Sequence, residues 1–358
     1  MNAWEPHLRP ALAELTAYDV PPADASFARL HANECPEPWP EACVERIVEA
    51  VRRVELGRYP DTSGREVRAL LGRIHGCDPN RIILGNGSDE IIGILMTALS
   101  GSGAPLVIPR PTFVMYAHMA RVLDIPVREV DLDEDFELDE AAMRRALDGA
   151  AICFLARPNN PTASLWDPAL IRRLVADFPS TVFVIDEAYG AYAPGQSMFD
   201  ADAPDNQVHM ATLSKVAGAA LRLGWCIATP PLAAALDKVR HPYNVSATTL
   251  AIAGVILGEL RDVQTAMVQA ALARRDRLSA LLARLPGAKV FPSGGNMVLA
   301  RLSSHDEPAR LARHLAERGV LIKDVSRQPR LAGCIRVSLG TADELDRLEA
   351  GIASFLTA

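Results

Sequence analysis

Short apolar runs alternate with amphipathic helical patterns from residue 31 to about residue 240, and this alternation is the strongest constraint on the fold. Four of the runs are apolar on both faces: residues 82–84, 105–108, 151–155 and 182–185. Strands buried on both sides of a mainly parallel sheet have this character. Helix-like stretches, such as 139–147 and 168–178, lie between the runs. The pattern predicts an α/β domain with helices on both faces of the sheet.

The pattern changes after residue 245. A long helical region at 246–285 is followed by strand-like segments and two further helices; the strand-like segments are 297–302, 320–323 and 334–339. A chain of 358 residues is long enough for two domains. We therefore expect an N-terminal arm (1–30), a large α/β domain (31–245) and a small α+β domain (246–358).

Composition excludes several function classes. The net charge is -7 and no basic stripe stands out, so a nucleic-acid partner is not expected. The six cysteines are scattered without a C-x-x-C pair, which argues against a metal site and against a disulfide framework. No apolar run reaches the roughly 20 residues of a membrane span, and the first residues lack a signal-peptide core. The expectation is a cytoplasmic protein without a membrane or nucleic-acid partner.

Polar clusters follow three of the predicted strands. The first cluster contains Asn160, the second Asp186 and Tyr189, and the third Lys215. Each has an ordinary explanation: Asn-Asn-Pro forms turns, a carboxylate caps helices and a lysine is usually solvated. Ligands of open α/β sheets, however, bind at the carboxyl ends of the strands. Because all four side chains follow strands of one sheet, we expect them to converge on one site.

A glycine-rich turn at 85–90 links another predicted strand to an apolar helix. Such a turn presents backbone N–H groups and the positive end of the helix dipole to an anion. The turn matches neither the dinucleotide nor the triphosphate motif, so it favours a single phosphate. Arg222, seven residues after Lys215, could be a bidentate partner of that phosphate.

These motifs resemble a known family over almost the whole chain. NNPT at 159–162, DEAY at 186–189, SK at 214–215 and LRLGW at 221–225 resemble the fold-type I pyridoxal-5′-phosphate (PLP) enzymes of aminotransferase class I/II. Within that group the chain is similar to histidinol-phosphate aminotransferases. That similarity is carried by residues 15–18, 33–36, 58–61, 85–90 and 328–341.

The resemblance implies a role for each motif residue. Lys215 would hold PLP as a Schiff base and later move the α-proton, Asp186 would pair with the ring nitrogen, and Tyr116 would stack on the ring. Tyr189 and Asn160 would hydrogen-bond the ring's 3-oxygen. The phosphate group would be held by Gly87, Ser88, Asp89, Thr212, Ser214, Arg222 and Tyr59 of a partner subunit. The substrate would meet Tyr18, Asn33, Asn160, Lys323 and Arg336.

The implied activity is transamination of L-histidinol phosphate with 2-oxoglutarate by a homodimer with shared active sites. A carboxylate beside the pyridine nitrogen keeps it protonated, so that the ring can accept electrons. Three positions depart from the family pattern: Ala163 stands where glycine is usual, Lys323 where arginine is frequent, and the step from Lys215 to Arg222 is one residue short. Two alternatives remain open, a threonine-phosphate decarboxylase-like lyase and a broad aromatic aminotransferase.

Overall fold

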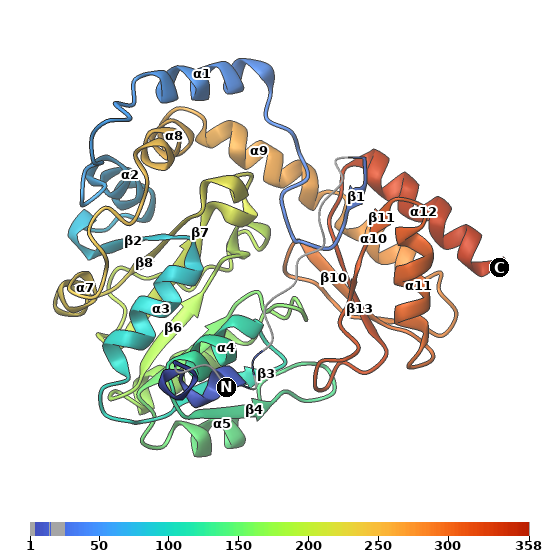
Figure 1. The fold of residues 1–358 in the computed structure, drawn as a ribbon. Helices are drawn as coiled ribbons and strands as arrows, with labels where there is room; N and C mark the ends of the chain where they lie inside the picture. The colour runs from blue at the N-terminus through green and yellow to red at the C-terminus, as the bar shows by residue number, and fades with distance from the viewer. Residues whose placement is uncertain (1–3, 14, 16–25, 358) are drawn as a thin grey trace.

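The computed structural model describes residues 4–13, 15 and 26–357. A larger body is built on a seven-stranded sheet, and a smaller body on a four-stranded sheet (Figure 1). The larger sheet has the order β2-β8-β7-β6-β5-β3-β4. Its strands are β2 (Ile82–Asn86), β3 (Leu106–Arg110), β4 (Val127–Asp131), β5 (Ile152–Ala156), β6 (Val182–Asp186), β7 (Gln207–Thr212) and β8 (Leu223–Ile227).

Six of these seven strands run in the same direction. β8 alone is antiparallel to its two neighbours, β2 and β7, and the pairs from β7 through β4 are parallel. β5 is buried at every position, and β2, β3 and β6 at four positions of five. The predicted α/β class with a mainly parallel sheet is confirmed.

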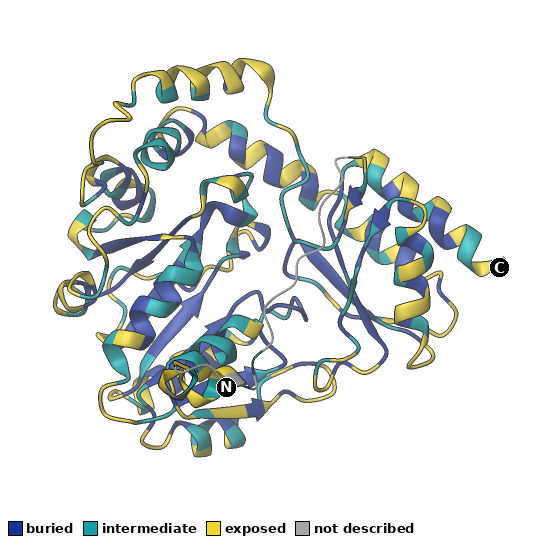
Figure 2. Ribbon diagram, viewed as in Figure 1, coloured by how far each residue is buried: buried dark blue, intermediate teal, exposed yellow. Residues whose placement is uncertain are grey.

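Helices cover both faces of the large sheet. One face, which carries Val184 and Met210, packs against α3 (Ser88–Leu99), α4 (Val114–Val122) and α7 (Pro230–Asp237). The other face packs against α2 (Arg65–His75), α5 (Glu140–Leu147), α6 (Pro168–Asp177) and α8 (Ala247–Gly258). Figure 2 shows the strands buried and the outer sides of many helices exposed. Successive residues of a strand therefore face different helix layers.

The smaller body is an antiparallel sheet in the order β12-β13-β10-β9. Its strands are β9 (Lys289–Val290), β10 (Met297–Arg301), β12 (Lys323–Asp324) and β13 (Cys334–Ser338), and its helices are α10 (Arg275–Leu282), α11 (Glu307–Ala316) and α12 (Ala342–Leu356). β1 (Ala28–Arg29) pairs in parallel with β11 (Val320–Leu321), so the end of the predicted arm adds a strand beside this body. The apolar faces of α11 and α12 bury Leu311 and Leu348 in its core.

The packing of α8 bears on the predicted domain boundary at residue 245. α8 lies beyond that boundary, yet Ala253 and Leu257 belong to the core formed with α2 and the large sheet. α1 (Glu41–Arg52) packs on its outer side. α9 (Arg261–Leu272) then leads from the larger to the smaller body (Figure 1). The exact boundary stays a proposal, and this packing moves it toward residue 260.

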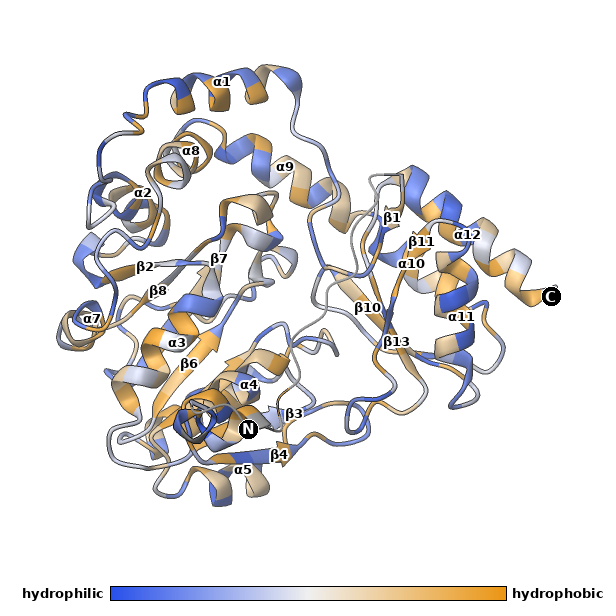
Figure 3. Cartoon of the chain, viewed as in Figure 1, coloured by the Kyte–Doolittle hydropathy of each residue, from blue (hydrophilic) through white to orange (hydrophobic). Residues whose placement is uncertain are grey.

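Hydropathy follows the same arrangement. The central strands are mostly apolar, whereas α1 and α11 alternate polar and apolar sides (Figure 3). Among the described residues, no helix combines the length and the apolar character that crossing a membrane requires.

Candidate functional site

A cavity of about 250 Å³ lies where the carboxyl ends of the large sheet meet the smaller body. Loops after β5, β6 and β7 form one wall, and β12 and β13 contribute the other. Six of the residues predicted from the sequence line it: Asn33, Asn160, Tyr189, Lys215, Lys323 and Arg336. The predicted convergence of strand ends is therefore present in the structure.

Lys215 ends a short 3-10 turn directly after β7. Its Nζ lies 3.4 Å from the carbonyl oxygen of Ala32 and 5.9 Å from the ring centre of Tyr189. Asn33 donates its side-chain N–H to the Tyr189 hydroxyl at 3.1 Å. Ser338, from β13, donates to Asn33 Oδ1 at 2.8 Å. Asn33 was predicted to bind substrate, and in this structure its amide positions Tyr189.

Asp186 ends β6 and is 4% exposed. Burial is the main reason why its pKa rises from 3.8 to about 6. The hydroxyl of Tyr116 donates to Oδ2 at 2.5 Å and the backbone N–H of Ala188 to Oδ1 at 2.9 Å; both bonds lower the pKa. A buried carboxylate of this kind is stabilised by a cation placed against it, and a protonated pyridine nitrogen is such a cation.

The phosphate-sized turn is also in place. α3 begins at Ser88 with no side-chain cap, so its first N–H groups are available for an anion. Gly87 has φ 80°, and a Cβ there would lie 2.5 Å from Arg222 Nη2, so the guanidinium packs directly on this glycine. Arg222 is held by Asp89 Oδ2 at 2.9 Å and donates to Ser214 Oγ at 3.3 Å.

Thr212 completes this group. Its Oγ1 accepts the backbone N–H of Ser214 at 3.1 Å, which fixes the turn that leads to Lys215. The predicted phosphate ligands of one chain thus meet around the start of α3, apart from Tyr59. A helix N-terminus, two hydroxyls and one guanidinium fit a phosphate monoester, and Asp186 and Lys215 lie on the ring side. The residues present fit PLP.

Two cations from the smaller body line the opposite wall. Lys323 and Arg336 are direct neighbours across β12 and β13, so both side chains lie on one face of that sheet. Arg336 Nη1 donates to Asn160 Oδ1 at 2.7 Å and Nη2 to the carbonyl of His31 at 2.5 Å. Among the described residues that line the cavity there is no Asp or Glu.

Tyr116 does not occupy the place predicted for it. Its ring is 0% exposed, it stacks on Phe154 with centres 4.7 Å apart, and it is not among the cavity-lining residues. Burial is the main reason why the pKa of its hydroxyl rises well above 10. Phe113, three residues earlier, lines the cavity and contacts the edge of Tyr116. The structure does not place Tyr116 on the cavity wall as the stacking role requires: its hydroxyl supports Asp186, and Phe113 is the aromatic ring that lines the cavity.

Other lining residues were missed from the sequence. His31 follows β1 and lines the cavity, and its Nδ1 is buried without a hydrogen-bond partner among the described residues. Burial lowers the pKa of His31, so its uncharged form is favoured. Gln328 lies in the loop after β12. The run 111–116 offers two aromatic candidates three residues apart, and packing decides that Phe113 is the one that lines the cavity.

Tyr59 lies away from this cavity. Its side chain is 80% exposed and stacks on Tyr243 with centres 4.5 Å apart. Tyr18 lies outside the described residues.

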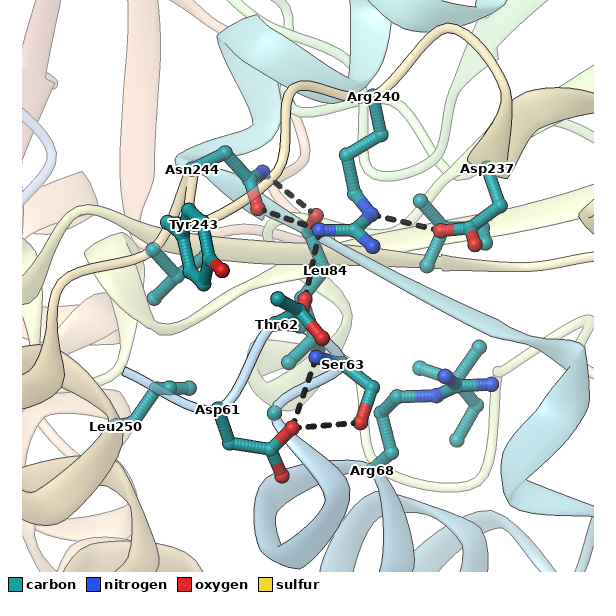
Figure 4. A pocket seen from close by; sticks show the side chains of 14 residues that line it. Asp61, Thr62, Ser63, Arg68, Leu84, Asp237, Arg240, Tyr243, Asn244 and Leu250 are labelled. Carbon is teal, nitrogen blue, oxygen red and sulfur yellow. Dashed lines mark hydrogen bonds and ion pairs between the residues drawn. The ribbon is translucent and has the colours of Figure 1, made fainter. Parts of the chain in front are cut away.

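The loop that carries Tyr59 is anchored at a small cleft of about 10 Å³ (Figure 4). Arg240 Nη1 donates to the carbonyl of Thr62 at 2.9 Å, and Asp61 accepts the backbone N–H and the hydroxyl of Ser63. Asn244 donates to the carbonyl of Leu84 at 3.0 Å. A cleft of this size holds at most a water molecule. Its role is to fix the loop on β2, with Tyr59 directed outward.

Comparison with known proteins places this geometry in a family. The model of "Aminotransferase class I and II" matches residues 26–352. Histidinol-phosphate aminotransferase 1 of Burkholderia lata is 40% identical over 352 residues, which cover 96% of each chain. The structure of histidinol-phosphate aminotransferase from Sinorhizobium meliloti with pyridoxal-5′-phosphate matches with a TM-score of 0.84 and 25% identity, over 97% of each chain.

A structure of L-threonine-O-3-phosphate decarboxylase from Porphyromonas gingivalis has the same fold, with a TM-score of 0.79 and 24% identity over 92% of this chain and 99% of that one. At this identity the likeness concerns the fold alone. The family model spans both bodies of the structure and the whole cavity between them. The chain therefore belongs to the aminotransferase class I and II family.

Proposed function

We propose that the chain catalyses transamination of L-histidinol phosphate with 2-oxoglutarate, giving imidazole acetol phosphate and glutamate, a step of histidine biosynthesis. The predicted enzyme class, a PLP-dependent aminotransferase, is confirmed by the family. The choice of substrate is supported by the relatives, which carry the name histidinol-phosphate aminotransferase at 38–40% identity over almost the whole chain.

One observation in the structure carries the substrate class. Lys323 and Arg336 line one wall of the cavity, and no described lining residue carries a carboxylate. A phosphate monoester and a dicarboxylate both place an anion at the end of the molecule away from the reacting nitrogen. Arg336 is suited to both, because its guanidinium offers two parallel N–H donors. Lys323 adds charge without that fixed geometry, which tolerates anions of different shape.

The residues of the chain then divide the work. When bound, the cofactor accepts the electron pair that remains after the α-proton departs. Asp186 keeps the ring nitrogen protonated, and Tyr116 and Ala188 hold its carboxylate in place. Lys215 Nζ, on the strand side of the cavity, is the base that takes the α-proton. Arg222 holds the phosphate end, and thus fixes the distance between that base and the substrate carbon.

We further propose that two copies share their active sites. Tyr59 is exposed and directed outward in one chain, although the family resemblance implies a contact with the cofactor phosphate. A two-fold dimer would account for the exposure of Tyr59 and for the implied phosphate contact, with each Tyr59 reaching into the partner's site. Exposed apolar side chains on α1 and in the turn that follows it, Val44, Val48 and Leu56, support a covering partner.

The test is product analysis with purified enzyme and PLP. L-Histidinol phosphate and 2-oxoglutarate should yield glutamate, and Lys215→Ala should abolish it. O-phosphothreonine, and separately phenylalanine with 2-oxoglutarate, serve as the competing substrates. Release of carbon dioxide from O-phosphothreonine would favour the lyase, and a higher kcat/KM with phenylalanine would favour an aromatic aminotransferase. Either result, without glutamate from histidinol phosphate, contradicts the proposal.

A further inference from the structure

The edge of the large sheet lies next to the turn that begins α3. β2 is the edge strand, so the backbone groups on its outer side lack a strand partner. Two such groups come from residues two positions apart, the carbonyl of Leu84 and the N–H of Asn86. α3 starts at Ser88, and Gly87 alone separates it from Asn86. The position of these backbone groups therefore sets the direction in which the chain enters the phosphate turn.

Two side chains bond these backbone groups and also each other. Asn244 Nδ2 donates to the carbonyl of Leu84 at 3.0 Å and to Glu90 Oε2 at 2.8 Å. The same Glu90 oxygen accepts the N–H of Asn86 at 2.5 Å. Asn244 and Glu90 are 154 positions apart in the chain. A distant loop and the first turn of α3 thus hold the turn 84–90 together.

Arg240 determines which way the Asn244 amide points. Its Nη1 donates to Asn244 Oδ1 at 3.0 Å, so the amide oxygen faces the guanidinium and the amide nitrogen faces β2 (Figure 4). Asp237 accepts from Arg240 Nε at 2.7 Å, and the carbonyl of Thr62 accepts from Nη1 at 2.9 Å. The Arg240 side chain is 11% exposed. The amide is therefore held in one orientation.

The position of Glu90 matters for an anion bound at the start of α3. Glu90 lies in the first turn of that helix, where a glutamate commonly reaches back to the N–H group of the cap residue. A carboxylate there would occupy a backbone donor and repel a phosphate. In this chain Glu90 instead bonds Asn86, which precedes the cap residue Gly87. The bond from Asn244 holds the carboxylate at the strand end, which leaves the first N–H groups of α3 for the phosphate.

We propose that Glu90 and Asn244 are positioning residues for the phosphate group of the cofactor. They act through the backbone of residues 84–88, and Arg240 fixes the Asn244 amide in the orientation that this requires. The inference rests on the phosphate site around Arg222 and the start of α3 in the proposed function. It adds that the affinity of this site depends on a hydrogen-bonded network at the edge of the sheet.

The test compares PLP with pyridoxal, which lacks the phosphate, in absorbance titrations of cofactor-free enzyme. Glu90→Ala and Asn244→Ala should each weaken PLP binding about 3–10-fold, the effect of one hydrogen bond, and change the Kd of pyridoxal less than about twofold. A general loss of structure would weaken the binding of both ligands. In cofactor-free protein, hydrogen exchange at the Asn86 amide should also be faster in Glu90→Ala, because the acceptor of that N–H is removed.

Conservative variants separate the hydrogen bonds from the charge. Glu90→Gln keeps an acceptor oxygen and should bind PLP within about twofold of wild type. Asn244→Asp places a second carboxylate against Glu90 and should weaken PLP binding about tenfold. Adding Glu90→Gln to Asn244→Asp restores a donor and acceptor pair and should recover most of that loss. Glu134→Ala, at an exposed position after β4, is the matched control and should bind both ligands as wild type does.

Arg222→Gln is the reference variant, because its guanidinium would contact the phosphate itself. If Arg222→Gln weakens PLP binding selectively while Glu90→Ala and Asn244→Ala leave the Kd of PLP unchanged, the inference is wrong. Equal weakening of PLP and pyridoxal in Asn244→Ala would also overturn it, because the network would then support only the fold. Asn244 lies in a partly exposed loop, so Asn244→Ala decides the question even if Glu90→Ala does not fold. Equal weakening of the two ligands in Arg222→Gln would overturn the phosphate site together with the inference.

Discussion

The burial of Asp186 predicts how the stability of the cofactor-free enzyme depends on pH. Its pKa is about 6 in the folded chain against an ordinary 3.8, and burial is the main cause. The folded state therefore binds the proton more tightly than the unfolded state does. The stabilisation from this group is fully present below pH 3.8 and is lost as the pH rises through 6.

The size of the effect follows from the two pKa values. One pKa unit corresponds to about 1.36 kcal/mol, so the full loss is roughly 3 kcal/mol. Part of this loss has already occurred at pH 5. Between about pH 5 and about pH 7.5 the contribution of Asp186 to stability falls by roughly a further 1.4 kcal/mol. Asp186→Asn removes the titrating group and keeps the shape. The free energy of unfolding of wild type minus that of the variant should fall by this amount across the interval.

The assay is urea unfolding of cofactor-free protein, followed by circular dichroism at both pH values. With PLP bound the fall should shrink or vanish, because a cation beside the carboxylate favours its charged form. Tyr116→Phe removes a hydrogen bond to that carboxylate, so it should raise the pKa of Asp186 and make the fall in the cofactor-free enzyme larger. If the difference between wild type and Asp186→Asn stays constant from pH 5 to pH 7.5, the pKa of Asp186 is not raised by burial and the reasoning fails.

Three further substitutions test the site. Arg222→Gln should weaken PLP binding about 10–100-fold in an absorbance titration, because charge-assisted hydrogen bonds contribute roughly 1.5–3 kcal/mol; an unchanged Kd would place the phosphate elsewhere. Phe113→Leu should weaken PLP binding about 2–10-fold through lost stacking, and no change would contradict its position facing the ring. Gly224→Ala puts a Cβ 2.4 Å from the backbone N of Ser88 and should cost about 1–3 kcal/mol in urea unfolding. Gly57→Ala is its control: a Cβ at Gly57 would have no neighbour within 4 Å, so this variant should not lower the free energy of unfolding.

The sequence was informative about the strands that are buried on both sides. The apolar runs that predicted strands at 82–84, 105–108, 151–155 and 182–185 coincide with β2, β3, β5 and β6. β4 was not predicted, because it is an edge strand with the burial pattern of a partly exposed element. β8 was seen only as a motif, and nothing local in a sequence shows that it is antiparallel to its neighbours.

Long-range pairing was also beyond local patterns. β1 has two residues, and its partner β11 lies about 290 positions later in the chain. No periodicity exists in a strand of two residues, so residues 28–29 were included in the arm. The structure joins them to the smaller body, which also brings His31 and Asn33 over the cavity. One short pairing therefore positions two site residues.

Within the site, the sequence identified the residues at the ends of strands. It did not distinguish between the two aromatic residues at the start of a helix. Lys215, Asp186 and Asn160 follow strands whose direction was predicted, so their convergence could be inferred. Phe113 immediately precedes α4 and Tyr116 lies in its first turn, and which of the two aromatic rings faces the cavity depends on the rotation of that helix. Helix rotation is decided by packing, here by the contact of Tyr116 with Phe154 and Asp186.

That packing gives a physical reason why the two roles are separated. A ring that stacks on a cofactor must lose contact with it at each exchange of cofactor, so it lies at the surface of the cavity. A hydroxyl that holds a buried carboxylate must remain in place when the cofactor leaves, and Tyr116 is fully buried for this purpose. Because Phe113 has no hydroxyl, it cannot compete with Tyr116 for Asp186. The two aromatic residues thus have separate contacts: Tyr116 holds Asp186 through its hydroxyl, and Phe113 lines the cavity.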